Sequence, residues 1–304
     1  MSKKTIPTSP ESSNLPDWFP ARKERLVFEY DTNRYPFKQL IADWLGVPSC
    51  SLENIHTLPL PTSSNSKPIH PRICKAWKAA EMPRLSSKAR ECSTLTQQKL
   101  FQSPEYERLM NTYRLFIKEV VAPLCTDTSH DTNNIHVVYQ SPPTTRVVLP
   151  NGRPTISMHC DKEYKNHQEG EINFWLPLTN VWGTNSLWLE SQPNLGDFAP
   201  ISLRYGQAMR FDGHDCRHYT VQNETDSCRV SIDFRVVPSE LCTQRQCCGD
   251  FCVEETTNAG FISYPHKFWK ITRGIDIELD KREGIEASPL EFTLNSCHDS
   301  SVSI

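Results

Sequence analysis

The spacing of hydrophobic residues predicts helices in the first half of the chain. Apolar residues recur every three or four positions between 36 and 45, which is the period of a helix with one buried face: Phe37, Leu40, Ile41 and Leu45. Pro36 suits the first turn of such a helix. The Pro- and Ser-rich stretch 59–71 is typical of a loop.

A second helix is predicted from Pro104 to Val121. Ser103 is a good N-cap, and Pro104 suits the first helical position. Its apolar residues fall mainly on one broad face, and Pro123 is expected to end it because proline lacks the N–H that a helix interior needs.

From residue 135 onward, short β-branched and aromatic runs alternate with turn residues. This pattern is typical of an antiparallel sandwich or barrel. The predicted strands are Ile135–Gln140, Thr145–Leu149, Thr155–His159, Glu171–Pro177, Ser186–Glu190, Gln207–Phe211, His218–Gln222 and Cys228–Val236.

These patterns divide the chain into four parts. Residues 1–20 are rich in Ser, Pro, Lys and Thr and are predicted to be a mobile arm. Residues 21–134 form a helical part that packs on a β-rich core at 135–237. Residues 238–304 form a C-terminal extension whose aromatic stretch, Phe261–Ile271, packs on the core or covers its mouth.

Composition removes several classes of function. The 304 residues include 33 basic and 36 acidic side chains, for a net charge of -3, so no basic excess points to nucleic acid or an anionic membrane. No apolar run approaches the ~20 residues of a membrane-spanning helix, and no secretory signal is recognisable at the N-terminus. We therefore expect a cytoplasmic protein.

The 12 cysteines are scattered, and a disulfide framework belongs mainly to short secreted chains. Free thiols in a reducing compartment are the favoured interpretation. Cys242, Cys247, Cys248 and Cys252 cluster, but their spacing differs from the C-x₂₋₄-C pairs of structural zinc sites. A cysteine-rich loop is favoured over a zinc site.

The segment Met158–Asp161 contains an H-x-D pair. Residues i and i+2 of a strand share a face, so His159 and Asp161 can point at one metal ion. His218 is the best third ligand, with His214 four residues earlier as its competitor. Two histidines and one carboxylate form the facial triad of non-haem Fe(II) oxygenases, which leaves positions open for other ligands. An H-x-D pair alone is weak evidence.

A second pattern follows His218. Arg229 and Ser231 share one face of a strand. An arginine that projects into a barrel would be a buried charge without a partner, and a ligand carboxylate could supply that partner through two parallel hydrogen bonds. An exposed arginine paired with an aspartate is the alternative.

Taken together, His159-x-Asp161, His218 and Arg229 eleven residues later resemble the iron- and 2-oxoglutarate-dependent dioxygenases, in the branch of phytanoyl-CoA hydroxylase relatives. The stretch Gly170–Thr179 resembles the StrG-type subgroup of natural-product pathways. The resemblance covers about residues 135–237. It implies a mainly β fold with flanking helices, the double-stranded β-helix or jelly roll, with Fe(II), 2-oxoglutarate and O₂. It also implies iron ligation by His159, Asp161 and His218, and co-substrate binding by Arg229 and Ser231.

Further pocket residues are predicted from strand alternation. Asn173 and Trp175 share a face, and a buried amide needs a partner, so Asn173 is expected to contact 2-oxoglutarate or substrate. Arg146, Lys162, Tyr164 and Trp175 are candidate substrate residues that would suit a carboxylate-bearing small molecule. The combination of a StrG-type core, a short chain and a composition rich in Cys and Pro resembles that of algal kainoid synthases. This resemblance implies oxidative cyclisation of an N-prenylated glutamate.

Several alternatives stay open on the sequence. A hydroxylase of an amino acid or aminocyclitol would use the same core. A zinc hydrolase would need a general base, for which Glu163 is the adjacent candidate, and it leaves Arg229 unexplained. A non-catalytic β-sandwich binding module would make the metal pattern accidental. The sequence does not determine the oligomeric state.

Overall fold

The computed structural model describes residues 15–58, 70–80, 101–126, 136–164 and 167–242, together with the backbone of two later strands. The principal helices are α1 (Pro20–Lys23), α2 (Phe37–Leu45), α3 (Pro71–Ala79), α5 (Pro104–Phe116) and α6 (Ala122–Cys125). Short 3-10 turns include Ser49–Thr57, Asp161–Glu163, Gly183–Asn185 and Ser239–Leu241. None of the helices within the described residues has the length and apolar content that a bilayer crossing requires.

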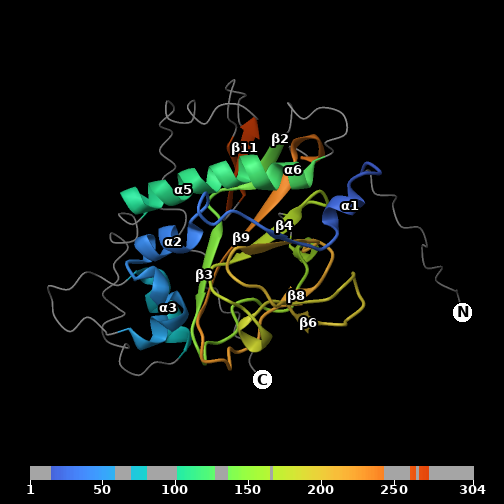
Figure 1. Cartoon of the computed structure of the whole chain (residues 1–304). Coiled ribbons are helices and arrows are strands. Elements are labelled where there is room, and N and C mark those ends of the chain that lie inside the picture. The colour runs from blue at the N-terminus through green and yellow to red at the C-terminus, as the bar shows by residue number, and fades with distance from the viewer. Residues whose placement is uncertain are drawn as a thin grey trace, which may run out of the picture.

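The strands form two antiparallel sheets (Figure 1). The large sheet has the order β1-β7-β4-β9-β2-β11-β10, with β3 also paired to β9. Its strands are β1 (Leu26–Glu29), β2 (His136–Gln140), β3 (Thr144–Val148), β4 (Ile172–Pro177), β7 (Gln207–Phe211), β9 (Arg229–Pro238), β10 (Phe261–Tyr264) and β11 (Lys267–Arg273). The small sheet has the order β6-β5-β8, from β5 (Trp188–Leu189), β6 (Ala199–Pro200) and β8 (His218–Tyr219).

The strand pairing is that of a double-stranded β-helix. From β3 onward, successive segments of the chain alternate between the two sheets. β3 lies in the large sheet, His159 joins the small sheet through an isolated bridge to His218, and β4 returns to the large sheet. The chain continues through β5 and β6 of the small sheet, β7 of the large, β8 of the small and β9 of the large. The predicted jelly roll with flanking helices is confirmed.

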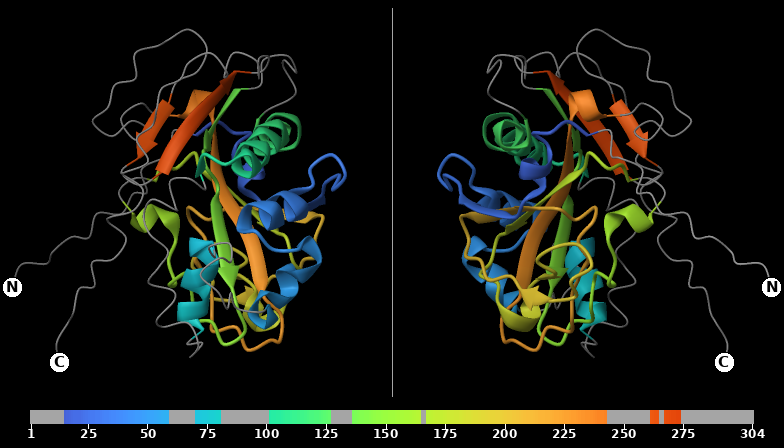
Figure 2. Two further views of the ribbon diagram at one scale, coloured as in Figure 1. Left: turned by 90° about the vertical axis from the view of Figure 1, so that its left-hand side faces the viewer. Right: turned by 90° about the vertical axis from the view of Figure 1, so that its right-hand side faces the viewer.

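Helices cover the outer face of the large sheet, and Figure 2 shows them against it from two sides. Tyr113 of α5 packs edge-on against Phe234 of β9, with ring centroids 5.1 Å apart, and its hydroxyl donates to the Gln140 carbonyl of β2. Phe174 of β4 stacks on Phe234 at 5.4 Å. Since helices bury this outer face, both faces of β4 and β9 are enclosed. Strand alternation alone therefore could not identify which face points into the interior between the two sheets.

The second predicted helix differs from expectation at its end. A π-helical turn at Ile117–Val121 follows α5, and the helix resumes as α6 with Pro123 near its start. The first positions of a helical segment tolerate a residue without an N–H, so the helix passes Pro123 and ends at Cys125. The prediction that Pro123 ends the helix is therefore wrong.

Other sequence predictions are corrected at element ends. The last residues of the predicted mobile arm are ordered, since Phe19 is fully buried; residues 1–14 lie outside the described residues. Of the predicted loop 59–71, positions 59–69 also lie outside them, and His70 caps the unpredicted helix α3 by accepting from the Arg72 N–H. Of the predicted strand Thr155–His159, His159 alone forms a bridge, because the preceding residues follow an irregular path.

The C-terminal extension contributes two strands to the large sheet. β11 pairs with β10 and with β2, so this part of the extension lengthens the sheet. Free thiols are found at Cys50, Cys74, Cys125, Cys160, Cys216 and Cys228. Cys242 is disulfide-bonded, so the prediction of free thiols is wrong at that residue. Cys247, Cys248 and Cys252 lie outside the described residues.

Candidate metal and co-substrate site

The three predicted metal ligands meet at one end of the small sheet. The backbones of His159 and His218 are joined by two hydrogen bonds, of 3.2 and 2.8 Å, which place the two rings 4.5 Å apart. The chain then turns, and the Asp161 N–H donates to the Gly213 carbonyl at 2.9 Å. The candidate ligand atoms of the three side chains all lie within 4.8 Å of one another.

Backbone carbonyls hold both imidazole rings. Nδ1 of His159 lies 2.7 Å from the Ser157 carbonyl, and Nδ1 of His218 lies 3.1 Å from the Cys216 carbonyl. Because a carbonyl only accepts, each Nδ1 carries the proton and each Nε2 presents its lone pair. Two imidazole nitrogens and a carboxylate can therefore face one ion.

Burial and charge keep these groups in the forms that bind metal. Burial lowers the pKa of His218 to about 4, so its ring is neutral at physiological pH. Burial pushes the pKa of Asp161 upward, but the charge of Arg235 and its hydrogen bonds outweigh this effect and hold that pKa well below its usual range. Asp161, with no exposed surface, is thus a buried carboxylate anion.

The alternative ligand His214 is not part of this cluster. Its Nδ1 lies 3.2 Å from Asp215, which directs the ring to another carboxylate. A second group of possible ligands among the described residues combines Asp161 with His167 and Glu171. In that group the Glu171 carboxylate already has two partners, Nδ1 of His167 at 2.6 Å and the Gln168 N–H at 3.1 Å.

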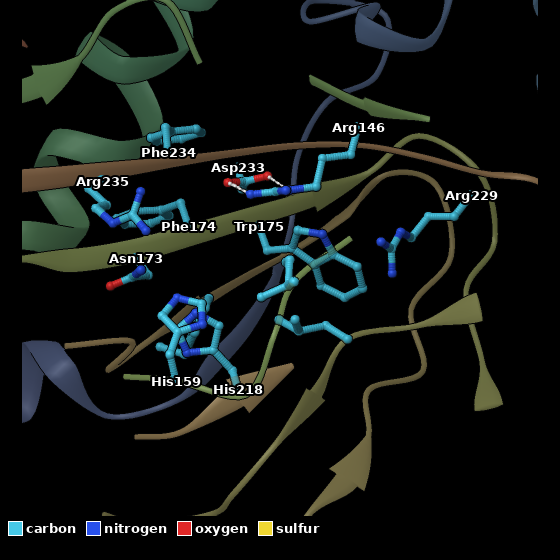
Figure 3. Close-up of a pocket in the computed structure, with 13 residues that line it drawn as sticks. Arg146, His159, Asn173, Phe174, Trp175, His218, Arg229, Asp233, Phe234 and Arg235 are labelled. Atoms are coloured by element: carbon cyan, nitrogen blue, oxygen red, sulfur yellow. Dashed lines mark hydrogen bonds and ion pairs between the residues drawn. The ribbon is translucent and has the colours of Figure 1, made fainter. Parts of the chain in front are cut away.

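Arg229 occupies the same pocket as the two histidines (Figure 3). It is 2% exposed and, within the described part of the chain, donates to two neutral acceptors: the Asn185 carbonyl and the Thr155 hydroxyl, both at 3.1 Å. Its Nε and the Ser231 hydroxyl are buried without a hydrogen-bond partner. Burial, and then the neighbouring Arg146, lower the pKa of Arg229 to about 9.

The structure also places the remaining predicted residues. Asn173 and Trp175 line the pocket, which holds about 490 Å³ of empty space with its open mouth included. The Asn173 amide nitrogen donates to Asp161 at 2.8 Å, so it contacts a candidate ligand directly. Arg146 also lines the pocket, where it forms a two-point ion pair with Asp233, at 2.7 and 3.3 Å.

Two predicted substrate residues lie outside the pocket lining. Lys162 pairs with Asp215 at 3.2 Å. Tyr164 is 51% exposed and its ring lies 5.1 Å from that of His159, beside the metal cluster.

Sequence reasoning missed Arg235 and Asp233, both on the inner face of β9. The signal was present, because the alternation that pairs Arg229 with Ser231 continues to residues 233 and 235. What the pattern could not show is which carboxylate each arginine meets.

Comparison with known proteins gives one sequence relative of note. The chain is 35% identical over 123 residues to the streptomycin biosynthesis protein StrG of Streptomyces griseus, a match that covers 40% of this chain and 58% of StrG. The chain thus spans less than two thirds of the length of that relative. No protein-family model matches the chain.

Solved structures give weaker matches. EctD from S. alaskensis, solved with 2-oxoglutarate and 5-hydroxyectoine, aligns with a TM-score of 0.43 at 12% identity, over 77% of this chain and 80% of EctD. The non-haem monooxygenase ThoJ, in its apo form, aligns with a TM-score of 0.38 at 12% identity, over 66% and 75% of the two chains. The fold assignment rests on the strand pairing of this chain and not on these structures. The similarity in sequence is to StrG.

Proposed function

We propose that this chain is an Fe(II)- and 2-oxoglutarate-dependent oxygenase that acts on a small natural-product precursor. The observation that carries the proposal is the buried Arg229, with its unsatisfied Nε, in the same pocket as a His/Asp/His cluster. A buried guanidinium without an acidic partner is costly, and a carboxylate ligand would remove that cost.

The donor set suits iron. Two neutral imidazoles and one carboxylate match the facial triad, in which half of an octahedral shell is left to other ligands. His159, Asp161 and His218 would hold the metal. Bound iron with 2-oxoglutarate and O₂ supplies the oxidation of an unactivated carbon.

The opposite part of the pocket suits the distal carboxylate of 2-oxoglutarate. Figure 3 draws Trp175 between the histidines and Arg229. The fork of Arg229 can bind a carboxylate through two parallel hydrogen bonds, and the free Ser231 hydroxyl can add a third. A dicarboxylate that spans from the metal to Arg229 would satisfy the unpartnered atoms at this end of the pocket.

The rival functions explain less. A zinc hydrolase needs a base beside the metal, but Glu163 forms an ion pair with Arg217 at 2.8 Å on the surface. A non-catalytic binding module would leave the convergent histidines and the buried Arg229 without a purpose.

For the substrate, we propose an N-prenylated glutamate that is cyclised oxidatively to a kainoid pyrrolidine, with hydroxylation of an amino acid or aminocyclitol as the alternative. The Arg146–Asp233 pair offers a guanidinium and a carboxylate side by side in the pocket, which suits a substrate with both carboxylate and ammonium groups. Trp175 supplies an aromatic wall for an apolar tail. Lys162 and Tyr164 stay candidates for the entrance, and the cytoplasm stays the proposed location.

The test combines metal analysis with turnover. Protein loaded with Fe(II) without oxygen is given O₂, 2-oxoglutarate and a panel of amino-acid and aminocyclitol substrates. Oxidative cyclisation changes the product mass by about -2 Da, and hydroxylation by about +16 Da. Products of the second kind alone would exclude cyclisation. Zinc-dependent hydrolysis without 2-oxoglutarate consumption would exclude the oxygenase.

A further inference from the structure

The Asp161 carboxylate is held from two sides by residues of neighbouring strands. Arg235 of β9 donates from Nε to Oδ2 at 2.6 Å and from Nη2 to Oδ1 at 2.8 Å. Asn173 of β4 donates to Oδ2 at 2.8 Å. Arg235 and Asn173 are direct partners across the β4–β9 pair, so one register of the large sheet delivers both donors to the same carboxylate.

These contacts leave the two carboxylate oxygens unequal. Oδ2 accepts two hydrogen bonds, from Arg235 and Asn173, whereas Oδ1 accepts one and lies 3.4 Å from Nε2 of His159. A carboxylate oxygen has about two lone pairs that can accept, so the two donors on Oδ2 leave it little capacity to bind a metal. Oδ1 is therefore the atom that can reach an ion beside the histidines.

From this geometry we propose that Arg235 and Asn173 are positioning residues that make Asp161 a one-oxygen ligand. The proposal rests on the metal site proposed above. A carboxylate that bound through both oxygens would take one of the positions that a two-point co-substrate and O₂ require. Arg235 and Asn173 would thus preserve the open half of the metal shell, in addition to orienting the carboxylate.

Gly213 provides the space for this arrangement. A Cβ on Gly213 would lie 2.4 to 2.7 Å from the side-chain amide of Asn173, which is closer than real contacts allow. The Gly213 carbonyl also accepts from the Asp161 N–H, so this residue meets both the carboxylate segment and its amide donor. Gly213→Ala should therefore push Asn173 away from Asp161 without removing any polar group.

The test uses Co(II), whose visible spectrum reports the number and type of its ligands, with purified full-length protein. Arg235→Lys, which keeps the charge but loses the fork, and Asn173→Ala should each weaken Co(II) binding by about 10- to 100-fold and alter the spectrum. Arg210→Lys is the matched control. Arg210 is equally buried but donates to backbone carbonyls of Ala21, Glu24 and Leu124, so its loss should lower thermal stability and leave Co(II) affinity unchanged.

A double-mutant cycle separates positioning from general damage. Gly213→Ala should weaken Co(II) binding in the wild-type background and have little further effect beside Asn173→Ala, because the clashing amide is then gone. Unchanged affinity and spectrum in the Arg235 and Asn173 variants, or additive losses in the cycle, would overturn the positioning role. Failure of the wild-type protein to bind Co(II) at all would instead overturn the proposed metal site.

Discussion

Arg229→Met should separate the stability of the free protein from its response to 2-oxoglutarate. Most buried arginines stabilise the folded state through acidic partners, and their removal is costly. Arg229 has neutral acceptors and an unsatisfied Nε in the described structure, so its charge is disfavoured until a ligand arrives. We expect the variant to fold about as stably as the wild type but to gain no stability from 2-oxoglutarate.

The magnitudes follow from the site. Burial, and then Arg146, lower the pKa of Arg229 to about 9, and each unit of pKa shift corresponds to about 1.36 kcal/mol, so the charged form is disfavoured in the folded protein by several kcal/mol. In the opposite direction, methionine leaves the Asn185 carbonyl and the Thr155 hydroxyl without this donor, which costs about 1–3 kcal/mol each. The two effects nearly cancel, and the free energy of unfolding without ligand should change by less than about 2 kcal/mol.

The ligand response has a larger expected size. At a 2-oxoglutarate concentration of 100 times Kd, binding stabilises the wild type by about 2.7 kcal/mol. For a protein of 304 residues, that corresponds to a rise in Tm of roughly 4 °C.

The assay is thermal unfolding with Mn(II) in place of iron, with and without 2-oxoglutarate. Arg210→Met is the control, because its guanidinium is satisfied by backbone carbonyls: this variant should lose stability and keep the ligand response. A strongly destabilised Arg229→Met variant that keeps the full rise in Tm would refute the reasoning, since Arg229 would then be structural.

Three further predictions concern the ligands, the fold and the substrate. Alanine at any of the three proposed ligands, His159, Asp161 or His218, should abolish iron binding and turnover. His214→Ala should keep the wild-type iron stoichiometry, and the reverse result would change the ligand assignment. Burial lowers the pKa of His70 to about 3, so the stability due to its neutral ring is full above pH 6.5 and is lost as the pH falls toward 3. His70→Asn, which keeps the helix cap, should flatten that acid loss in chemical denaturation, and an unchanged pH profile would count against it. Arg146→Gln should raise the KM for an amino-acid substrate several-fold and leave the 2-oxoglutarate constant unchanged; a shift in the co-substrate constant instead would place Arg146 at the co-substrate.

Local sequence patterns determined the chemistry of the candidate site. Strand alternation, which assigns residues i and i+2 to a shared face, suggested both the H-x-D and the R-x-S pair. Arg229 and Ser231 do lie in a strand, whereas Asp161 begins a 3-10 turn. The fold class was readable for a related reason, since short alternating runs with regular turns are typical of antiparallel sheets. Each of these pairs consists of residues close together in the chain, whereas His218 was chosen for its spacing to Arg229, which resembles that of a known family. The structure brings the candidate ligand atoms of His159, Asp161 and His218 within 4.8 Å of one another.

The tertiary structure decided which distant residues meet. Asn173 and Arg235 are 62 positions apart, yet the β4–β9 register makes them direct partners, and both donate to Asp161. The sequence could not show which face of β4 points into the pocket, because all residues of this strand are buried. Helices cover its outer face, and the pocket encloses its inner face. The passage of a helix through Pro123 depends on a π-helical turn that no local signal predicted. Register between strands, the covering of faces and the space beside Gly213 arise from packing of the whole chain, and residue order alone does not specify them.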